Sequence, residues 1–136
     1  MKVNSTQSAT SFLKIALPLF LFMVAFSYCK KEPKALDREK FLGTYDVNEN
    51  CASGNYSYSI TITESSVNTT DVIVNNVGDF GFNYTGTVSG NNLTINGTQQ
   101  GLTINGTGTI NGNALTIIYS ASGAFDDNCT ATAIKR

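Results

Sequence analysis

The fold is decided by residues 91–119, which read NNLTINGTQQGLTINGTGTINGNALTIIY. Apolar side chains alternate with polar ones in three runs, which begin at Leu93, Leu102 and Leu115. Asn and Gly separate the runs, and these residues accept the positive φ angles of tight hairpin turns at little cost. Alternation with a period of two is typical of strands that have one buried face. This stretch therefore predicts three consecutive antiparallel strands.

The same alternation continues on both sides of this stretch. Five further segments are predicted as strands, at residues 43–51, 56–63, 72–74, 80–88 and 129–134. Eight short strands at intervals of about ten residues predict an all-β domain, an antiparallel eight-stranded meander that closes into a small barrel. A two-sheet β-sandwich is the alternative.

A short repeat raises one rival fold. The hexapeptide LTINGT occurs at residues 93–98 and again at 102–107, and fixed short periods can indicate a β-solenoid. Two copies are too few for a solenoid, and the paired glycines and recurrent Asp of the calcium-binding nonapeptide type are missing. Two similar strands of one hairpin explain the repeat more simply.

Residues 1–28 have the layout of a secretory signal peptide. Lys2 and Lys14 precede an uncharged, mainly apolar run at residues 15–28. This run is shorter than the about 20 apolar residues that a membrane-spanning helix needs. We therefore expect residues 1–28 to direct export and to be removed.

Cys29 follows this run directly, at the position where bacterial lipoproteins carry the cysteine that is lipidated and becomes the N-terminus. We expect residues 29–40 to form a lipid anchor and a charged, solvated tether, and residues 41–136 to form the barrel domain. The expected location is the bacterial cell envelope, anchored in the outer membrane on either of its faces. Stable attachment to a membrane generally takes two acyl chains.

Composition excludes several functions. Residues 41–134 contain no Lys or Arg, so the clustered cations that nucleic-acid binding requires are missing. The chain has no His, which removes His-based nucleophile pairs, general bases and metal sites. We therefore expect neither an enzyme nor a bound cofactor or metal ion. The sequence leaves the oligomeric state open.

Cys51 ends the first predicted strand of the domain, and Cys129 begins the last. In a closed eight-stranded meander these strands are antiparallel neighbours, so the two residues would face each other. An exported domain is in an oxidising environment, which favours a disulfide. Two free thiols are the alternative, because a zinc site would lack ligands.

Four aromatic residues are candidates to line a cavity for a small apolar or glycan ligand: Tyr58, Phe82, Tyr84 and Tyr119. Core filling is the alternative role for them. Glu49 lies on an inward strand face but close to the strand end, where a solvated carboxylate is the more common outcome. The oxygen-rich residues 126–128 are more typical of a turn than of a calcium site.

Four segments together resemble a group of small lipoproteins from Bacteroidetes that has no assigned activity. These segments are Cys29-Lys30-Lys31, FLGTYDVNENC at residues 41–51, the NNLTINGT and INGNALTIIY stretches, and Cys129-Thr130-Ala131-Thr132. The resemblance implies a lipocalin-like β-barrel with a cavity for an apolar ligand. A structural or adhesive envelope module with a filled interior is the alternative function.

Overall fold

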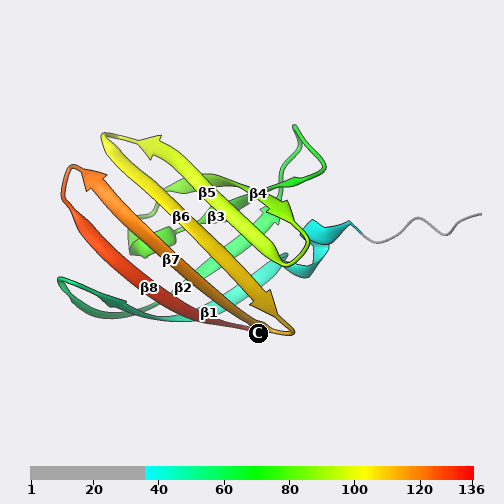
Figure 1. Ribbon diagram of the computed structural model, residues 1–136, viewed down its shortest axis with the longest axis horizontal. Coiled ribbons are helices and arrows are strands. Elements are labelled where there is room, and N and C mark those ends of the chain that lie inside the picture. The colour runs from blue at the N-terminus through cyan, green and yellow to red at the C-terminus, as the bar shows by residue number, and fades with distance from the viewer. Residues whose placement is uncertain (1–35) are drawn as a thin grey trace, which may run out of the picture. The chain divides into compact units, whose positions relative to one another are not determined.

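The computed structural model describes residues 36–136, which form a closed barrel of eight antiparallel strands (Figure 1). The strands are β1 (Gly43–Cys51), β2 (Gly54–Glu64), β3 (Asp71–Asn75), β4 (Asn83–Ser89), β5 (Asn92–Gln99), β6 (Leu102–Asn111), β7 (Ala114–Gly123) and β8 (Asp127–Lys135). Two short 3-10 helices accompany them, η1 (Asp37–Lys40) and η2 (Val77–Asp79). Within this part of the chain, no helix has the length and apolar character needed to cross a bilayer.

The barrel closes where β1 pairs with β8. Each strand pairs with the next along the chain, and the β1–β8 ladder runs from Tyr45 opposite Lys135 to Cys51 opposite Cys129. The eight-stranded meander predicted from the sequence is confirmed, whereas the alternative of two separate sheets is wrong. The two LTINGT copies lie in β5 and β6, which are the paired strands of one hairpin.

The fourth strand begins later than the sequence pattern predicts. It starts at Asn83, whereas Phe80 is the C-cap of η2. Asn76, Asp79 and Gly81 have φ angles of 71°, 59° and 72°, so the backbone there is left-handed rather than extended. These three residues redirect the chain across the end of the barrel before β4 begins.

Glycine makes room for large side chains inside the barrel. Gly106 on β6 lies opposite Ile95 on β5 and opposite Tyr119 on β7. A Cβ at Gly106 would lie 2.6 Å from the Cβ of Tyr119, and one at Gly86 would lie 2.5 Å from Cδ1 of Leu93. Alternation of large and small residues is how a narrow barrel fits side chains from facing strands. The strand glycines of the sequence therefore have a packing role.

Large side chains fill most of the interior. The largest of the fully buried ones are Tyr45, Tyr84, Phe41, Ile62, Leu93, Ile95, Ile104, Leu115 and Ile117. Burial raises the pKa of Tyr45 to about 12, and its hydroxyl donates a 2.8 Å hydrogen bond to the Phe41 carbonyl. The middle of the barrel is therefore a packed core rather than a channel.

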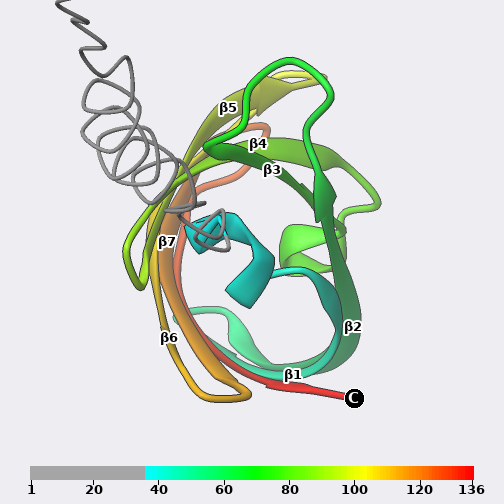
Figure 2. The ribbon, with the colours of Figure 1, turned by 90° about the vertical axis from the view of Figure 1, so that its right-hand side faces the viewer.

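One end of the barrel is covered by η1 (Figure 2). The Arg38 side chain donates hydrogen bonds of 3.2 and 3.0 Å to the carbonyl oxygens of Ser65 and Asn68 in the β2–β3 loop. Lys40 Nζ also bonds to the side chain of Asn91 in the β4–β5 turn, at 3.0 Å. These bonds attach η1 to the barrel, and the two belong to one compact unit.

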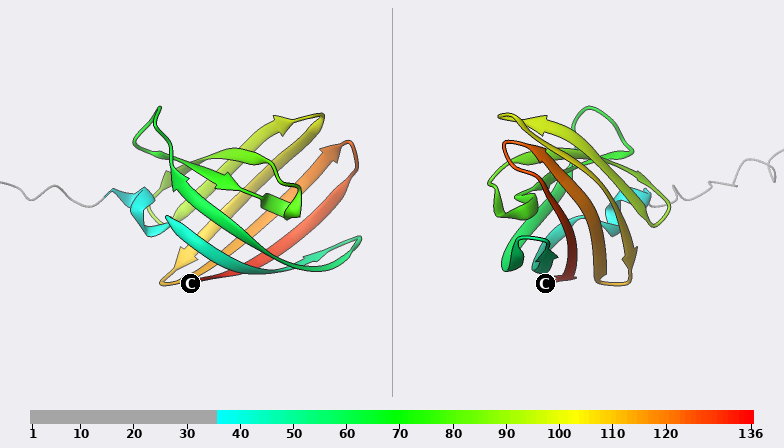
Figure 3. Two further views of the ribbon diagram at one scale, coloured as in Figure 1. Left: turned by 180° about the vertical axis from the view of Figure 1, so that it is seen from behind. Right: turned by 60° about the vertical axis from the view of Figure 1, so that its left-hand side comes forward.

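The other end carries η2, as the views of Figure 3 show. Val77 in η2 is 2% exposed and belongs to the hydrophobic core. The backbone N–H of Gly78 donates a 3.0 Å hydrogen bond to the Tyr58 hydroxyl, which ties η2 to β2. The two helices thus cover opposite ends of the barrel.

The predicted disulfide between Cys51 and Cys129 is present. The two residues are direct partners in the β1–β8 ladder, and their Cα atoms lie 4.1 Å apart. The backbone N–H of Ala52 donates to the Asn128 carbonyl beside this pair. In an antiparallel ladder, cross-strand pairs that do not exchange backbone hydrogen bonds have the shorter Cα–Cα distance, so their side chains lie closest together. The bridge therefore joins the first and last strands at the barrel seam.

Replacing both bridging cysteines, Cys51→Ser with Cys129→Ser, should lower the melting temperature. The bridge spans 78 residues, and chain-entropy estimates for a loop of this length give about 4–5 kcal/mol as an upper range. Thermal unfolding followed by circular dichroism tests this, with the reduced wild-type protein as the control. An unchanged melting temperature in both samples would show that the bridge does not stabilise the barrel.

Candidate functional site

We call the end of the barrel that carries η2 the mouth. Besides the β5–β6 turn, three segments meet there: the β1–β2 turn (residues 51–54), residues 76–82 with η2, and the β7–β8 turn (residues 123–127). A hollow of about 440 Å³ lies among them, and ligand pockets commonly measure about 300–1,000 Å³. Its lining comprises Glu49, Cys51, Ser53, Tyr56, Gly78, Phe80, Tyr119, Phe125, Asp126, Asp127 and Cys129.

Glu49 is the more deeply buried of the two buried carboxylates of this hollow, the other being Asp127. The Glu49 side chain points inward from β1, and the residue is only 4% exposed. The hydroxyls of Tyr58 on β2 and Tyr119 on β7 both donate hydrogen bonds to its Oε1, at 2.7 and 2.9 Å. Two charge-assisted hydrogen bonds of this kind compensate for the loss of water around a buried carboxylate.

The expectation that Glu49 is solvated is therefore wrong. The reason is its position in the ladders: Glu49 lies opposite Ala131 on β8, and Tyr119 lies opposite Cys129 on the same strand. The small side chain of Ala131 separates the two, so the Tyr119 hydroxyl can reach across β8 to the carboxylate. This partner is 70 residues away in the sequence, and it becomes apparent only when the barrel is closed.

The two tyrosines remain protonated hydrogen-bond donors. Burial raises the pKa of the Tyr58 hydroxyl, and its hydrogen bond to Glu49 raises it further. Burial likewise raises the pKa of Tyr119, and the negative charge of Glu49 adds to the effect. These hydroxyls hold the carboxylate in place, and their raised pKa values mean that they keep their protons near neutral pH.

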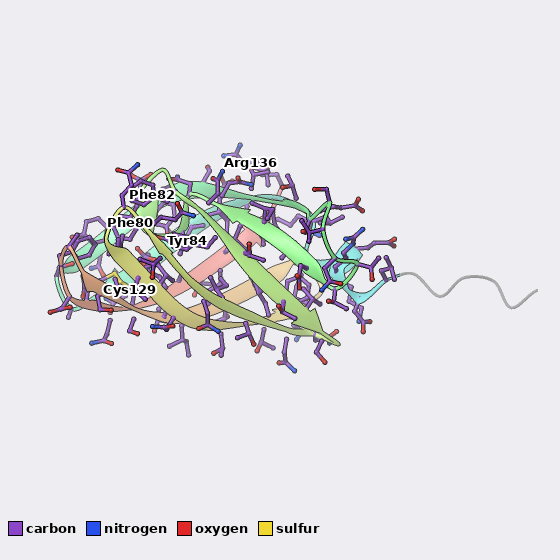
Figure 4. All side chains as sticks on the ribbon, turned by 90° about the horizontal axis from the view of Figure 1, so that it is seen from above. Phe80, Phe82, Tyr84, Cys129 and Arg136 are labelled. Atoms are coloured by element: carbon purple, nitrogen blue, oxygen red, sulfur yellow. A yellow bond between two sulfur atoms is a disulfide. The ribbon has the colours of Figure 1, made fainter. Side chains whose placement is uncertain are left out.

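Aromatic rings and a second carboxylate form the rim. The rings of Phe80 and Phe125 lie 5.0 Å apart, tilted by 60°, and Figure 4 shows Phe80 and Cys129 at the end opposite η1. Asp127 begins β8 and accepts a hydrogen bond from the Ser53 hydroxyl. This bond, with further bonds from backbone N–H groups, lowers the pKa of Asp127.

The structure separates the four predicted ligand residues. It brings Tyr58 and Tyr119 together at Glu49, and of the four only Tyr119 lines the hollow. Tyr84 is 1% exposed inside the barrel, and its hydroxyl lies 3.5 Å from the Leu102 carbonyl. Phe82 is half-buried against the core, in the segment before β4.

Sequence reasoning missed part of the lining: Ser53, Tyr56 and Phe125. The signal was indirect, because these residues lie in or beside turns. In a meander, alternate turns lie at the same end of the barrel, so residues 51–54, 76–82 and 123–127 had to meet. The spacing of turns, rather than any motif, could have identified them.

The mouth has few ligand atoms available for a metal ion. The only three-ligand group among residues 36–136 comprises Glu49, Cys51 and Cys129, whose ligand atoms lie within 4.8 Å of one another. Both sulfur atoms are joined in the disulfide, so they are not thiolate ligands. Both carboxylate oxygens of Asp127 already accept hydrogen bonds, from Ser53 and from the backbone of Asn128.

A larger hollow of about 670 Å³ lies on the outer wall over β5–β8 and the end of β1. It is shallow, and Asn, Thr and Ser side chains make up most of its lining. Ligand sites usually combine an enclosed apolar surface with a few converging polar groups. The mouth has this combination and the outer wall lacks it, so the mouth is the candidate site.

Comparison of the chain with protein-family models, with curated proteins and with solved structures finds no match.

The variant Tyr119→Phe should lower the free energy of unfolding by about 1.5–3 kcal/mol, because it removes a hydrogen bond to a charged group. Tyr84→Phe is the matched control. Its hydroxyl makes only a 3.5 Å contact with a neutral carbonyl, so the loss should stay within about 1 kcal/mol. Urea denaturation at pH 7 measures both. Equal losses in the two variants would contradict a special role for the Glu49 pair.

Proposed function

We propose that this chain is a lipid-anchored protein of the bacterial cell envelope whose barrel binds a small, mainly apolar ligand at the mouth. The hollow of about 440 Å³ carries the binding part of the proposal. Two of its aromatic side chains, Tyr56 and Phe125, are 46% and 41% exposed. Exposed aromatic rings gathered in a concave site are typical of ligand binding.

The packed core limits where a ligand would bind. Tyr45 and Tyr84 are at most 1% exposed, and with the other core side chains they fill the barrel interior. A ligand would therefore occupy the mouth and not the full length of the barrel. The same packing also favours the second candidate, a structural or adhesive envelope module without a ligand.

The location rests on the sequence pattern around Cys29, which lies outside the described residues. We expect cells that express the protein to incorporate labelled palmitate into it. The variant Cys29→Ala should abolish the label, whereas Cys51→Ala should retain it because that cysteine lies within the barrel seam. Labelling that survives in Cys29→Ala would overturn the lipid anchor.

Native mass spectrometry of protein extracted from its own envelope tests the ligand. We expect an additional mass from a non-covalently bound small molecule. Phe125→Ala should reduce the occupied fraction roughly fivefold through loss of one aromatic contact. The control is Ile134→Ala, which alters a residue that is 46% exposed on β8 and does not line the hollow.

A wild-type protein that is consistently empty would contradict ligand binding and favour the structural module. An occupied fraction that falls equally in both variants would place the ligand away from the mouth.

A further inference from the structure

The charge of the mouth is entirely negative. Glu49, Asp126 and Asp127 line the hollow, and Asp79 is exposed beside it. The chain has no Lys or Arg between residues 41 and 134, so no side chain at the mouth supplies a compensating positive charge.

The cations of the described residues lie elsewhere and have partners there. Arg38 pairs with Glu64, and Arg136 pairs with Asp46. Lys135 bonds to the Lys40 carbonyl beneath η1 and lies 5.5 Å from the centre of the Tyr45 ring. The acids of the mouth thus remain without a cationic partner among residues 36–136.

Glu49 has an oxygen available. Both tyrosine hydroxyls bond to Oε1, and within the described part of the chain no hydrogen-bond donor reaches Oε2. The residue lines the hollow although it is only 4% exposed. A fixed carboxylate with one free oxygen at the floor of an aromatic-walled hollow suits a ligand that carries a positively charged hydrogen-bond donor.

The aromatic walls of the hollow also favour a positively charged ligand. Tyr56, Phe80 and Phe125 surround the opening above Glu49, and the faces of aromatic rings attract cations. A desolvated anion would meet carboxylates without any neutralising group. The rings of Phe80 and Phe125 offer no oxygen ligands to a hard metal ion, which requires several.

We propose that the mouth binds a small organic ammonium ion, with its nitrogen at Glu49 Oε2 and its apolar part against the rings of Phe80 and Phe125. This inference rests on the proposed function, because it names the chemical class of the ligand at the same site. The tyrosine hydroxyls would hold the carboxylate in place for the ligand, and Asp126 and Asp127 would attract cations to the rim.

Three probes of similar size and different charge test the proposal: 2-phenylethylamine, 2-phenylethanol and phenylacetate. Each is titrated calorimetrically into the full-length protein in non-ionic detergent, and a titration into detergent alone is subtracted. The amine should bind at least about tenfold more tightly than the alcohol, since it alone forms the ion pair. Phenylacetate should bind most weakly.

Variants of Glu49 and Asp126 test whether these carboxylates cause the preference for the amine. Glu49→Gln should weaken amine binding about tenfold and leave the alcohol unchanged, because it removes the charge while preserving the side-chain shape. Asp126→Asn, at the exposed rim, should weaken the amine about twofold. Asp71→Asn is the matched control, since it removes the same charge near the η1 end, where Asp71 bonds to Thr87.

Equal binding of the amine and the alcohol to the wild-type protein would overturn the ammonium proposal and leave apolar binding at the mouth intact. Failure of all three probes to bind would overturn both proposals. Comparing the three probes on the wild-type protein tests the ammonium proposal even if Glu49→Gln does not fold.

Discussion

The pairing of β1 with β8 is the constraint on which the rest of the structure depends. This ladder closes the barrel, and the Cys51–Cys129 bridge holds its register at the mouth. Glu49 precedes Cys51 by two residues, so alternation along the strand directs its side chain to the barrel interior. A slip of one residue would turn it to the outside. The seam that closes the fold therefore also positions the carboxylate.

The distribution of small residues explains how a narrow barrel can hold several tyrosines. On β8 the inward positions include Ala131 and Ala133, both buried. On β6, Gly106 lies opposite Tyr119. The space left by these residues accommodates rings from other strands, so the tyrosine hydroxyls can converge on Glu49. The polar group at the mouth is thus a consequence of packing in the strands around it.

Much of the fold was predictable because it depends on local patterns. Alternation and Asn-Gly turns identify the strands, and the closed meander follows from their number and order, which also places Cys51 opposite Cys129. The sequence pattern was misleading at Phe80, where alternation continues but the left-handed backbone of Asn76 and Asp79 forms η2 instead. Of the two partners of Glu49, Tyr58 lies on the adjacent strand β2, whereas Tyr119 lies 70 residues away and could not be predicted, because its contact depends on strands distant in the sequence.

The position of η1 has a directional consequence. The described chain enters the barrel at the η1 end, and the hollow opens at the opposite end, beyond the packed core. If the proposed lipid anchor holds the domain, the chain leads from the anchor to the η1 end, and the mouth is the end of the barrel farther along from it. For a ligand that reaches the mouth from the aqueous phase, exchange would be governed by diffusion in water and by its ionic strength.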